Sequence, residues 1–199
     1  MRAEKYSWDF EHGGKTIQTI LRENGQGDLI IQQQHSDEEL SRGLWFAQHA
    51  VRSFFVSVLL YVKQENIESI LDDHGERLFT RIKKLPDIGG NFHDGVSIHD
   101  AKSDFDCYGG RPICNDPKEA QLIAQFGGDA GYMGLDGKIL TLNHGATKRK
   151  FNDPLIIPPE QTEELIFGLV YAASHGMCRT FKSELVDRLN YFFTTFVHQ

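Results

Sequence analysis

The sequence predicts an α+β protein with an N-terminal antiparallel meander, central apolar helices and a second, mixed α/β half. Three observations lead to this prediction: period-two alternation near the N-terminus, a long apolar stripe of helical period after it, and turn signals between short apolar segments in the second half. The chain has 199 residues, of which 40% are hydrophobic, enough for one well-formed core. We therefore expect a single domain over 1–199, with a potential division into 1–86 and 87–199.

The first segment, 5–35, has the pattern of a meander. Apolar and polar residues alternate over 6–10, which is typical of a half-buried strand. Two further strand-like segments, 16–21 and 29–34, are separated by the sequence Asn-Gly-Gln-Gly at 24–27. Asn-Gly is a common hairpin turn because glycine adopts positive φ without steric cost. We expect three antiparallel strands here.

Two helical patterns follow the meander. The first covers 36–63, where Ser36 and Glu39 form a capping-box pattern and apolar residues then recur at spacings of three, four or seven. These apolar positions are Leu40, Leu44, Val51, Phe55, Val58 and Val62. The second pattern runs over 67–82, with a potential break at Gly75. We expect the first helix to be central to the core.

The second half begins with less regular patterns. No sustained period is found over 87–115, which predicts a long loop or short strands with large connections. Asp116-Pro117-Lys118-Glu119 has the composition of a helix start, so we expect a helix over 117–126. Asp136-Gly137 lies between two strand-like segments and predicts a tight hairpin. The other expected elements are a strand over 155–157, a helix over 160–174 and a last helix over 183–197, of which 191–196 is alternatively a strand.

Composition limits the classes of function. The net charge of −7 disfavours binding to nucleic acid, because proteins that neutralise phosphates present a basic face. Three cysteines are an odd, low count that does not indicate a disulfide framework. The N-terminus has no apolar signal core, and no apolar run approaches the roughly 20 residues of a membrane span. We expect a cytoplasmic protein with no membrane partner.

The first group of chemistry-capable residues consists of two His-Asp pairs. His93-Asp94 and His99-Asp100 are six residues apart, so an extended chain presents both histidines on one face. Imidazoles and carboxylates suit a divalent metal such as Mg, Mn or Zn, with His93, His99 and Asp100 as the ligands. Asp94 is a candidate catalytic carboxylate. The alternative is a polar surface loop whose aspartates cap turns.

A second group lies around Asp129, which is surrounded by glycines over 127–131. A carboxylate beside accessible backbone amides suits ligand binding or catalysis, so we take Asp129 as a second candidate catalytic residue. Gly128 and Gly131 are candidate ligand-binding residues, and the alternative for this segment is a helix cap followed by a turn. The downstream residues suited to bind a phosphate are His144, Lys148 and Arg149. A solvated turn is the alternative for that downstream segment.

A third group is the stretch 174–179, in which Cys178 lies near His175. A cysteine and a histidine can form a nucleophile and its base. We favour the alternative, a helix C-terminus closed by Gly176, with the histidine placed favourably against the helix dipole.

Several of these segments together resemble one family. They are Tyr108-Gly109-Gly110-Arg111-Pro112-Ile113-Cys114, the expected helix 117–126, Asp129-Ala130-Gly131 and Leu135-Asp136-Gly137-Lys138-Ile139. Their order is similar to that of the diadenylate cyclase domain and its sensor-like relatives, which combine a strand, a helix, an Asp-Gly-Ala motif, a hairpin and a later Arg-His-Arg motif. The chain has no Arg-His-Arg, and its triplet is in a different order. The resemblance implies an adenine-nucleotide or cyclic-dinucleotide ligand, with binding favoured over turnover.

The function expected from the sequence is therefore the binding of a nucleotide or a related phosphate-bearing small ligand, between segments 91–110 and 127–149. Two alternatives stay open. One is a non-enzymatic interaction module, such as a sensor, an inhibitor or a toxin–antitoxin-like partner, which binds another protein or forms a homo-oligomer. The other is a metal-dependent hydrolase that uses the cluster from His93 to Asp106.

Overall fold

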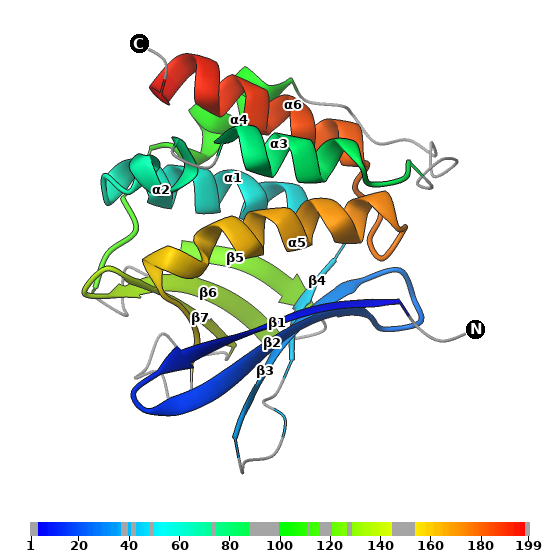
Figure 1. Ribbon diagram of the computed structural model, residues 1–199, viewed down its shortest axis with the longest axis vertical. Coiled ribbons are helices and arrows are strands. Elements are labelled where there is room, and N and C mark those ends of the chain that lie inside the picture. The colour runs from blue at the N-terminus through cyan, green and yellow to red at the C-terminus, as the bar shows by residue number, and fades with distance from the viewer. Residues whose placement is uncertain are drawn as a thin grey trace.

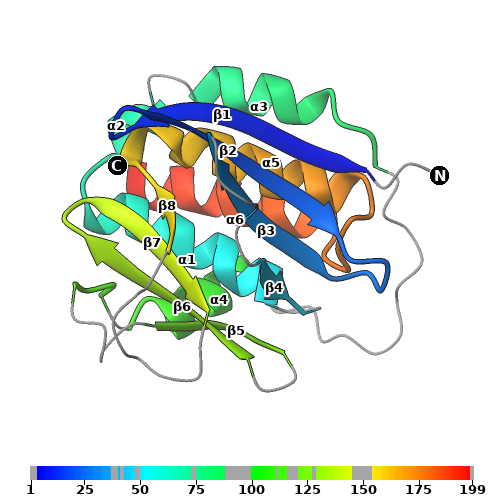
Figure 2. The same cartoon turned by 90° about the horizontal axis from the view of Figure 1, so that it is seen from below.

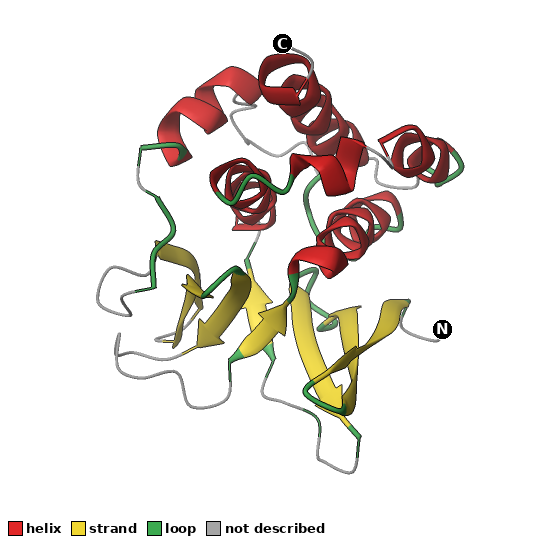
Figure 3. Cartoon of the chain, turned by 60° about the vertical axis from the view of Figure 1, so that its left-hand side comes forward, coloured by secondary structure: helices red, strands yellow, loops and turns green. Residues whose placement is uncertain are grey.

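The protein has the α+β fold that the sequence predicts. The computed structural model describes residues 4–36, 40, 43–47, 50–72, 75–87, 100–110, 112–115, 121–126, 129–144 and 154–197. The elements lie in three layers: two antiparallel sheets, an inner pair of helices across them, and an outer group of helices (Figure 1 and Figure 3). The inner helices are α1 (Ala50–Gln64) and α5 (Thr162–Ser174), and the outer group includes α3 (Gly75–Lys83), α4 (Ala101–Tyr108) and α6 (Lys182–Phe192).

The first sheet confirms the predicted meander and adds a fourth strand. Its order is β1-β2-β3-β4, and each pair is antiparallel. The strands are β1 (Lys5–His12), β2 (Lys15–Glu23), β3 (Leu29–His35) and β4 (Leu44–Phe46). The turn between β2 and β3 is the predicted glycine-rich one, in which Gly25 and Gly27 both have a φ of 85°.

Helix α1 is shorter than the helix predicted over 36–63, because it begins only at Ala50. Leu44 and Phe46 belong instead to β4, where both side chains are buried against the core. The prediction is wrong here because Leu44 lies four residues after Leu40, a spacing that fits a helix, while β3 offers backbone partners that override the local pattern. The apolar stripe after Ala50 does form the buried face of α1, so this helix is central to the core as expected.

The second sheet contains the predicted hairpin. Its order is β5-β6-β7-β8, again antiparallel. The strands are β5 (Gln121–Phe126), β6 (Asp129–Asp136), β7 (Ile139–His144) and β8 (Leu155–Ile157). The predicted hairpin is present, but its turn is at 137–138, one residue later than expected, because Asp136 is still in β6 and pairs with Ile139. Gly137 has a φ of 60° in this turn, and Leu155–Ile157 is a strand as predicted.

The helix expected over 117–126 is not found in its described part, since 121–126 is strand β5 and 116–120 lies outside the described residues. Residues of β5 pair with β6, and the Ile123 side chain is buried. A cap and a proline can start a helix, but they cannot outweigh the hydrogen bonds that an adjacent strand supplies. One part of the family pattern is therefore missing, and the resemblance itself stays a prediction.

The other helices agree with the sequence in part. The pattern over 67–82 becomes two helices, α2 (Glu68–Asp72) and α3, and Gly75 begins α3. The expected helix over 160–174 is found as a 3₁₀ turn followed by α5, and the last helix is α6 continued by a π-helical segment, Phe193–Val197, rather than a strand. Helix α4 lies in a region for which we expected a loop or strands. No helix within the described ranges is long and apolar enough to cross a membrane.

A buried glutamine joins the two sheets. Gln33 of β3 uses its side-chain amide like a strand backbone: Nε2 donates to Ile156 O at 2.7 Å, and Ile156 N donates to Gln33 Oε1 at 2.9 Å. Gln33 Nε2 also donates to Thr19 Oγ1 at 3.0 Å. These bonds connect β3 to β8 and satisfy backbone groups at the edge of the second sheet.

A buried ion-pair network holds α4 against α1 and α6. Asp104 of α4 lies 2.6 Å from Arg188 Nη2 and 3.1 Å from Arg52 Nε, and Arg52 Nη1 lies 3.2 Å from Glu184. All four side chains are at most 11% exposed. The two positive and two negative charges balance, which is the condition for burying them without a large penalty.

A second polar cluster joins β1, α3 and α5. Arg81 Nη1 lies 2.7 Å from Glu164, and the Arg81 guanidinium also lies 3.9 Å from the centre of the Phe167 ring. Tyr6 donates a hydrogen bond to Glu164 at 2.5 Å. Burial raises the pKa of Tyr6, so the phenol keeps its proton and remains a donor.

Candidate functional site

One end of the second sheet brings together three of the candidate residues. Strand β6 begins at Asp129, and the neighbouring antiparallel strand β7 ends at His144. Gly131 pairs with His144 in the register, two residues after Asp129. The chain therefore enters β6 and leaves β7 at the same end of the sheet (Figure 2). The sequence predicts the hairpin that joins these strands, but not the register that places Gly131 opposite His144.

The other three candidate ligand-binding residues are close in sequence to Asp129 or His144. Gly128 immediately precedes Asp129, whereas Lys148 and Arg149 follow His144 after a few residues. All three lie outside the described residues. Gly131 itself is buried, and its lack of a side chain lets other groups approach the backbone closely.

The two His-Asp pairs are described only at their last residue. His93, Asp94 and His99 lie outside the described residues, and Asp100 is the N-cap of α4. Its side chain accepts a hydrogen bond from Ser103 N at 2.7 Å, and this bond lowers the pKa of Asp100. A capping role was the alternative for the aspartates, and Asp100 has it. Within the described ranges, no group of three or more His, Cys, Asp or Glu side chains is arranged to hold a metal ion.

The segment that contains Cys114 contacts β6 at the end opposite Asp129. Leu135 N donates to Cys114 O at 3.2 Å, and Leu135 is near the C-terminal end of β6. At about 3.4 Å per residue, Leu135 and Asp129 are about 20 Å apart along the strand. The described residues after Gly110 therefore contact the opposite end of β6 from Asp129.

The stretch 174–179 is a helix end, as we favoured. Helix α5 ends at Ser174, and Gly176 has a φ of 70°. His175 stacks on the Tyr171 ring at a centroid distance of 3.9 Å. Cys178 is 4% exposed, and burial raises the pKa of its thiol to about 12, so the reactive thiolate is not formed at neutral pH.

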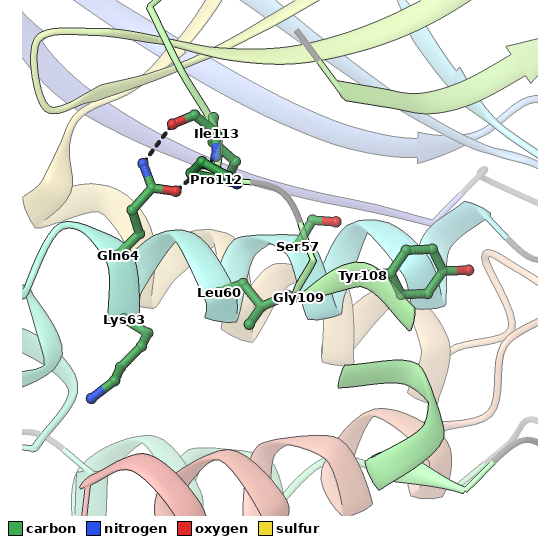
Figure 4. A pocket seen from close by; sticks show the side chains of 8 residues that line it. All are labelled: Ser57, Leu60, Lys63, Gln64, Tyr108, Gly109, Pro112 and Ile113. Atoms are coloured by element: carbon green, nitrogen blue, oxygen red, sulfur yellow. Dashed lines mark hydrogen bonds between the residues drawn. The ribbon is translucent and has the colours of Figure 1, made fainter. Parts of the chain in front are cut away.

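A pocket between α1 and α4 is a feature that the sequence did not indicate. It has a volume of about 260 Å³ and lies beside the segment 112–113 (Figure 4). Its lining residues are Ser57, Leu60, Lys63, Gln64, Tyr108, Gly109, Pro112 and Ile113. Ser57, Leu60 and Gln64 form one stripe along α1, and Ser57 interrupts an otherwise apolar run. That interruption was the one signal in the sequence that could have drawn attention to this face.

Comparison with known proteins adds no assignment. No family model matches the chain, and neither a curated protein nor a solved structure matches it.

Proposed function

We propose that the protein binds a nucleotide or a related phosphate-bearing small ligand at the end of the second sheet where β6 begins and β7 ends. The observation that carries this proposal is the register that pairs Gly131 with His144. It supports the proposal because Asp129 and the two chain segments with the candidate phosphate donors adjoin this end. A nucleotide ligand also fits a cytoplasmic location, which remains part of the proposal.

The chemistry of the proposed site is that of a phosphate-binding turn. The backbone amide of Gly128 donates a hydrogen bond, and Gly131 leaves the space beside the strand free of a side chain for the ligand. Lys148 and Arg149 supply positive charge in a chain whose net charge is −7. An imidazole N–H of His144 is a further hydrogen-bond donor for the phosphate. Asp129 is suited to a ribose hydroxyl or to a divalent ion such as Mg, Mn or Zn that accompanies the phosphates.

We propose binding without turnover, as in a degenerate diadenylate-cyclase-like domain. Two features of the sequence support this proposal. The chain has no Arg-His-Arg motif, and its triplet reads Asp-Ala-Gly where the family has Asp-Gly-Ala. A metal-dependent hydrolase on the cluster from His93 to Asp106 stays a prediction, as does a protein-binding module. Among the described residues, Leu40 is the one large apolar side chain classed as exposed, so no observation favours a protein interface over the small ligand.

A thermal-shift screen tests the proposal. Adenine nucleotides and cyclic dinucleotides, with and without magnesium or manganese, are expected to raise the melting temperature of the wild-type protein. Arg149→Ala should remove most of that shift, because losing one charge-assisted bond of roughly 1.5–3 kcal/mol weakens binding about tenfold or more.

The matched control is Lys138→Ala. Lys138 is exposed and lies in the turn at the opposite end of the β6–β7 pair, so its loss should leave the ligand-induced shift unchanged. If no nucleotide shifts the wild type, or if both variants lose the shift equally, the sheet-end site is refuted. Incubation with ATP followed by chromatography tests turnover, and formation of a cyclic product would contradict the non-catalytic part of the proposal.

A further inference from the structure

The pocket between α1 and α4 has almost no polar capacity left for a ligand. Both ends of the Gln64 amide are used by Ile113, whose N donates to Gln64 Oε1 at 2.7 Å and whose O accepts from Nε2 at 2.5 Å. The Tyr108 hydroxyl accepts a hydrogen bond from Ser53 Oγ at 2.7 Å, and it points away from the other side chains that line the pocket, so its own proton is not directed at a ligand there (Figure 4). What the pocket mainly offers is therefore apolar surface, from Leu60, Pro112 and Ile113 among others.

Ser57 provides the remaining polar group. Its hydroxyl donates to Ser53 O at 2.9 Å, and the side chain is buried, with the residue 4% exposed. The donated proton is used within α1, but the oxygen keeps a lone pair that no described residue occupies. The pocket consequently offers an acceptor to a ligand and requires a donor from it.

Electrostatics restrict the charge of the ligand. Helix α1 ends at Gln64 and α4 ends at Tyr108, so two helix C-termini, each with a partial negative charge, border the pocket. No basic residue lies in the last turn of α4. An anion is therefore disfavoured close to Tyr108.

A cation is disfavoured because no Asp or Glu is among the described residues that line the pocket, so a buried cation would have no carboxylate to pair with. Lys63 stands at the rim. Its side chain is 46% exposed, its ammonium lies 3.5 Å from Glu68, and it also lies 5.8 Å from the centre of the Phe196 ring. Because Glu68 and Phe196 already stabilise this charge, it offers only a weak attraction to an anion. A neutral ligand is favoured over either charged form.

The volume of the pocket restricts the size of the ligand. About 260 Å³ exceeds the roughly 150 Å³ of an apolar cavity that binds benzene, and it falls below the roughly 300 Å³ at which pockets for drug-sized ligands begin. One ring or two fused rings fit between these limits.

We propose that this pocket is a binding site for a small, neutral ring compound with one hydrogen-bond donor, of the indole or phenol class. The ring lies against Leu60 and Pro112, and its donor bonds to Ser57 Oγ. This site is separate from the end of the sheet where we place the phosphate-bearing ligand, and it does not depend on that assignment.

Calorimetric titration with indole and N-methylindole tests the proposal. Indole is expected to bind with one saturable site, and N-methylindole, which lacks the N–H donor, about two- to tenfold more weakly, as expected for one neutral hydrogen bond. Ser57→Ala should weaken indole to the level of N-methylindole. Indole-3-carboxylate should bind more weakly than indole, because it carries a negative charge.

Leu60→Trp should fill the pocket and abolish binding of both compounds. Its control, Ile70→Trp, replaces another partly buried aliphatic residue that lies on α2 away from the pocket and should leave binding intact. Circular dichroism checks that each variant is folded. The proposal is overturned if wild type shows no saturable indole binding, if the carboxylate binds as tightly as indole, or if Ser57→Ala leaves the indole to N-methylindole ratio unchanged. The Ser57→Ala ratio decides the matter even where Leu60→Trp does not fold.

Discussion

At the scale of single residues, the Gln33 side chain makes hydrogen bonds that join the two sheets. It is 1% exposed and satisfies both backbone polar groups of Ile156 as well as the Thr19 hydroxyl. A leucine of similar size would leave these buried groups without partners, and each such group costs more than an ordinary hydrogen bond contributes.

We predict that Gln33→Leu lowers the free energy of unfolding by about 2–4 kcal/mol, measured by urea denaturation. Gln34→Leu is the matched control, because Gln34 is the exposed neighbour on the same strand and its replacement should change stability by less than about 0.5 kcal/mol. Equal effects from the two substitutions would mean that the amide bonds to Ile156 contribute nothing beyond local strand preference.

At the scale of elements, α4 depends on its N-cap. Asp100 accepts the Ser103 amide hydrogen bond, and asparagine caps helices as well as aspartate does. We predict that Asp100→Ala lowers the melting temperature by a few degrees, whereas Asp100→Asn leaves it nearly unchanged. A metal ligand would behave differently, since an amide is a poorer ligand than a carboxylate. A loss of stoichiometric metal in Asp100→Asn would therefore assign Asp100 to a metal site.

The same cap predicts a pH dependence. The hydrogen bond lowers the folded-state pKa of Asp100 below its ordinary value of 3.8, so the carboxylate form stabilises the folded protein. That contribution is fully present above the ordinary pKa and is lost as the pH falls through the lower folded-state value. The stability difference between wild type and Asp100→Ala should thus be constant near neutral pH and shrink in acid, as thermal melts at a series of pH values would show. A difference that grows in acid would contradict the cap.

At the scale of the whole molecule, the buried Asp104 network connects three helices that are far apart in sequence. Asp104 is the carboxylate shared by Arg52 and Arg188, so its neutralisation leaves two buried guanidinium groups with Glu184 as the remaining carboxylate of the network. We predict that Asp104→Asn lowers the free energy of unfolding by about 3–5 kcal/mol, measured by urea denaturation. Asp106→Asn is the control, because Asp106 is 64% exposed on the same helix and its ion pair, within the described part of the chain, is with exposed Lys102. Similar losses in both variants would show that the network adds no more than a surface pair.

At the candidate site, the local sequence predicts which residue types suit a ligand, but not how these residues are arranged in space. Residue types identified Asp129, Gly131 and His144 separately, but their position at one end of a sheet follows from the pairing of β6 with β7. The hairpin turn at 137–138 sets that register, and the sequence predicts a turn here but places it one residue earlier. The pocket between α1 and α4 could not be predicted from the sequence, because the residues that line it come from segments about fifty positions apart. The polar Ser57 within an apolar run was the one indication of it.

The sequence by itself determined the elements whose signals are local: the N-terminal meander, the β6–β7 hairpin and the helix that ends at Ser174. In these elements, turn glycines, the alternation of apolar and polar residues, or apolar residues at helical spacing all lie within a few residues of one another. Such local patterns favour one backbone conformation. Tertiary structure alone decided that 121–126 is a strand, that Leu44–Phe46 extends the first sheet and that Gln33 links the two sheets. The physical reason is that a strand gains its hydrogen bonds from a partner elsewhere in the chain, so its stability is not contained in its own residues.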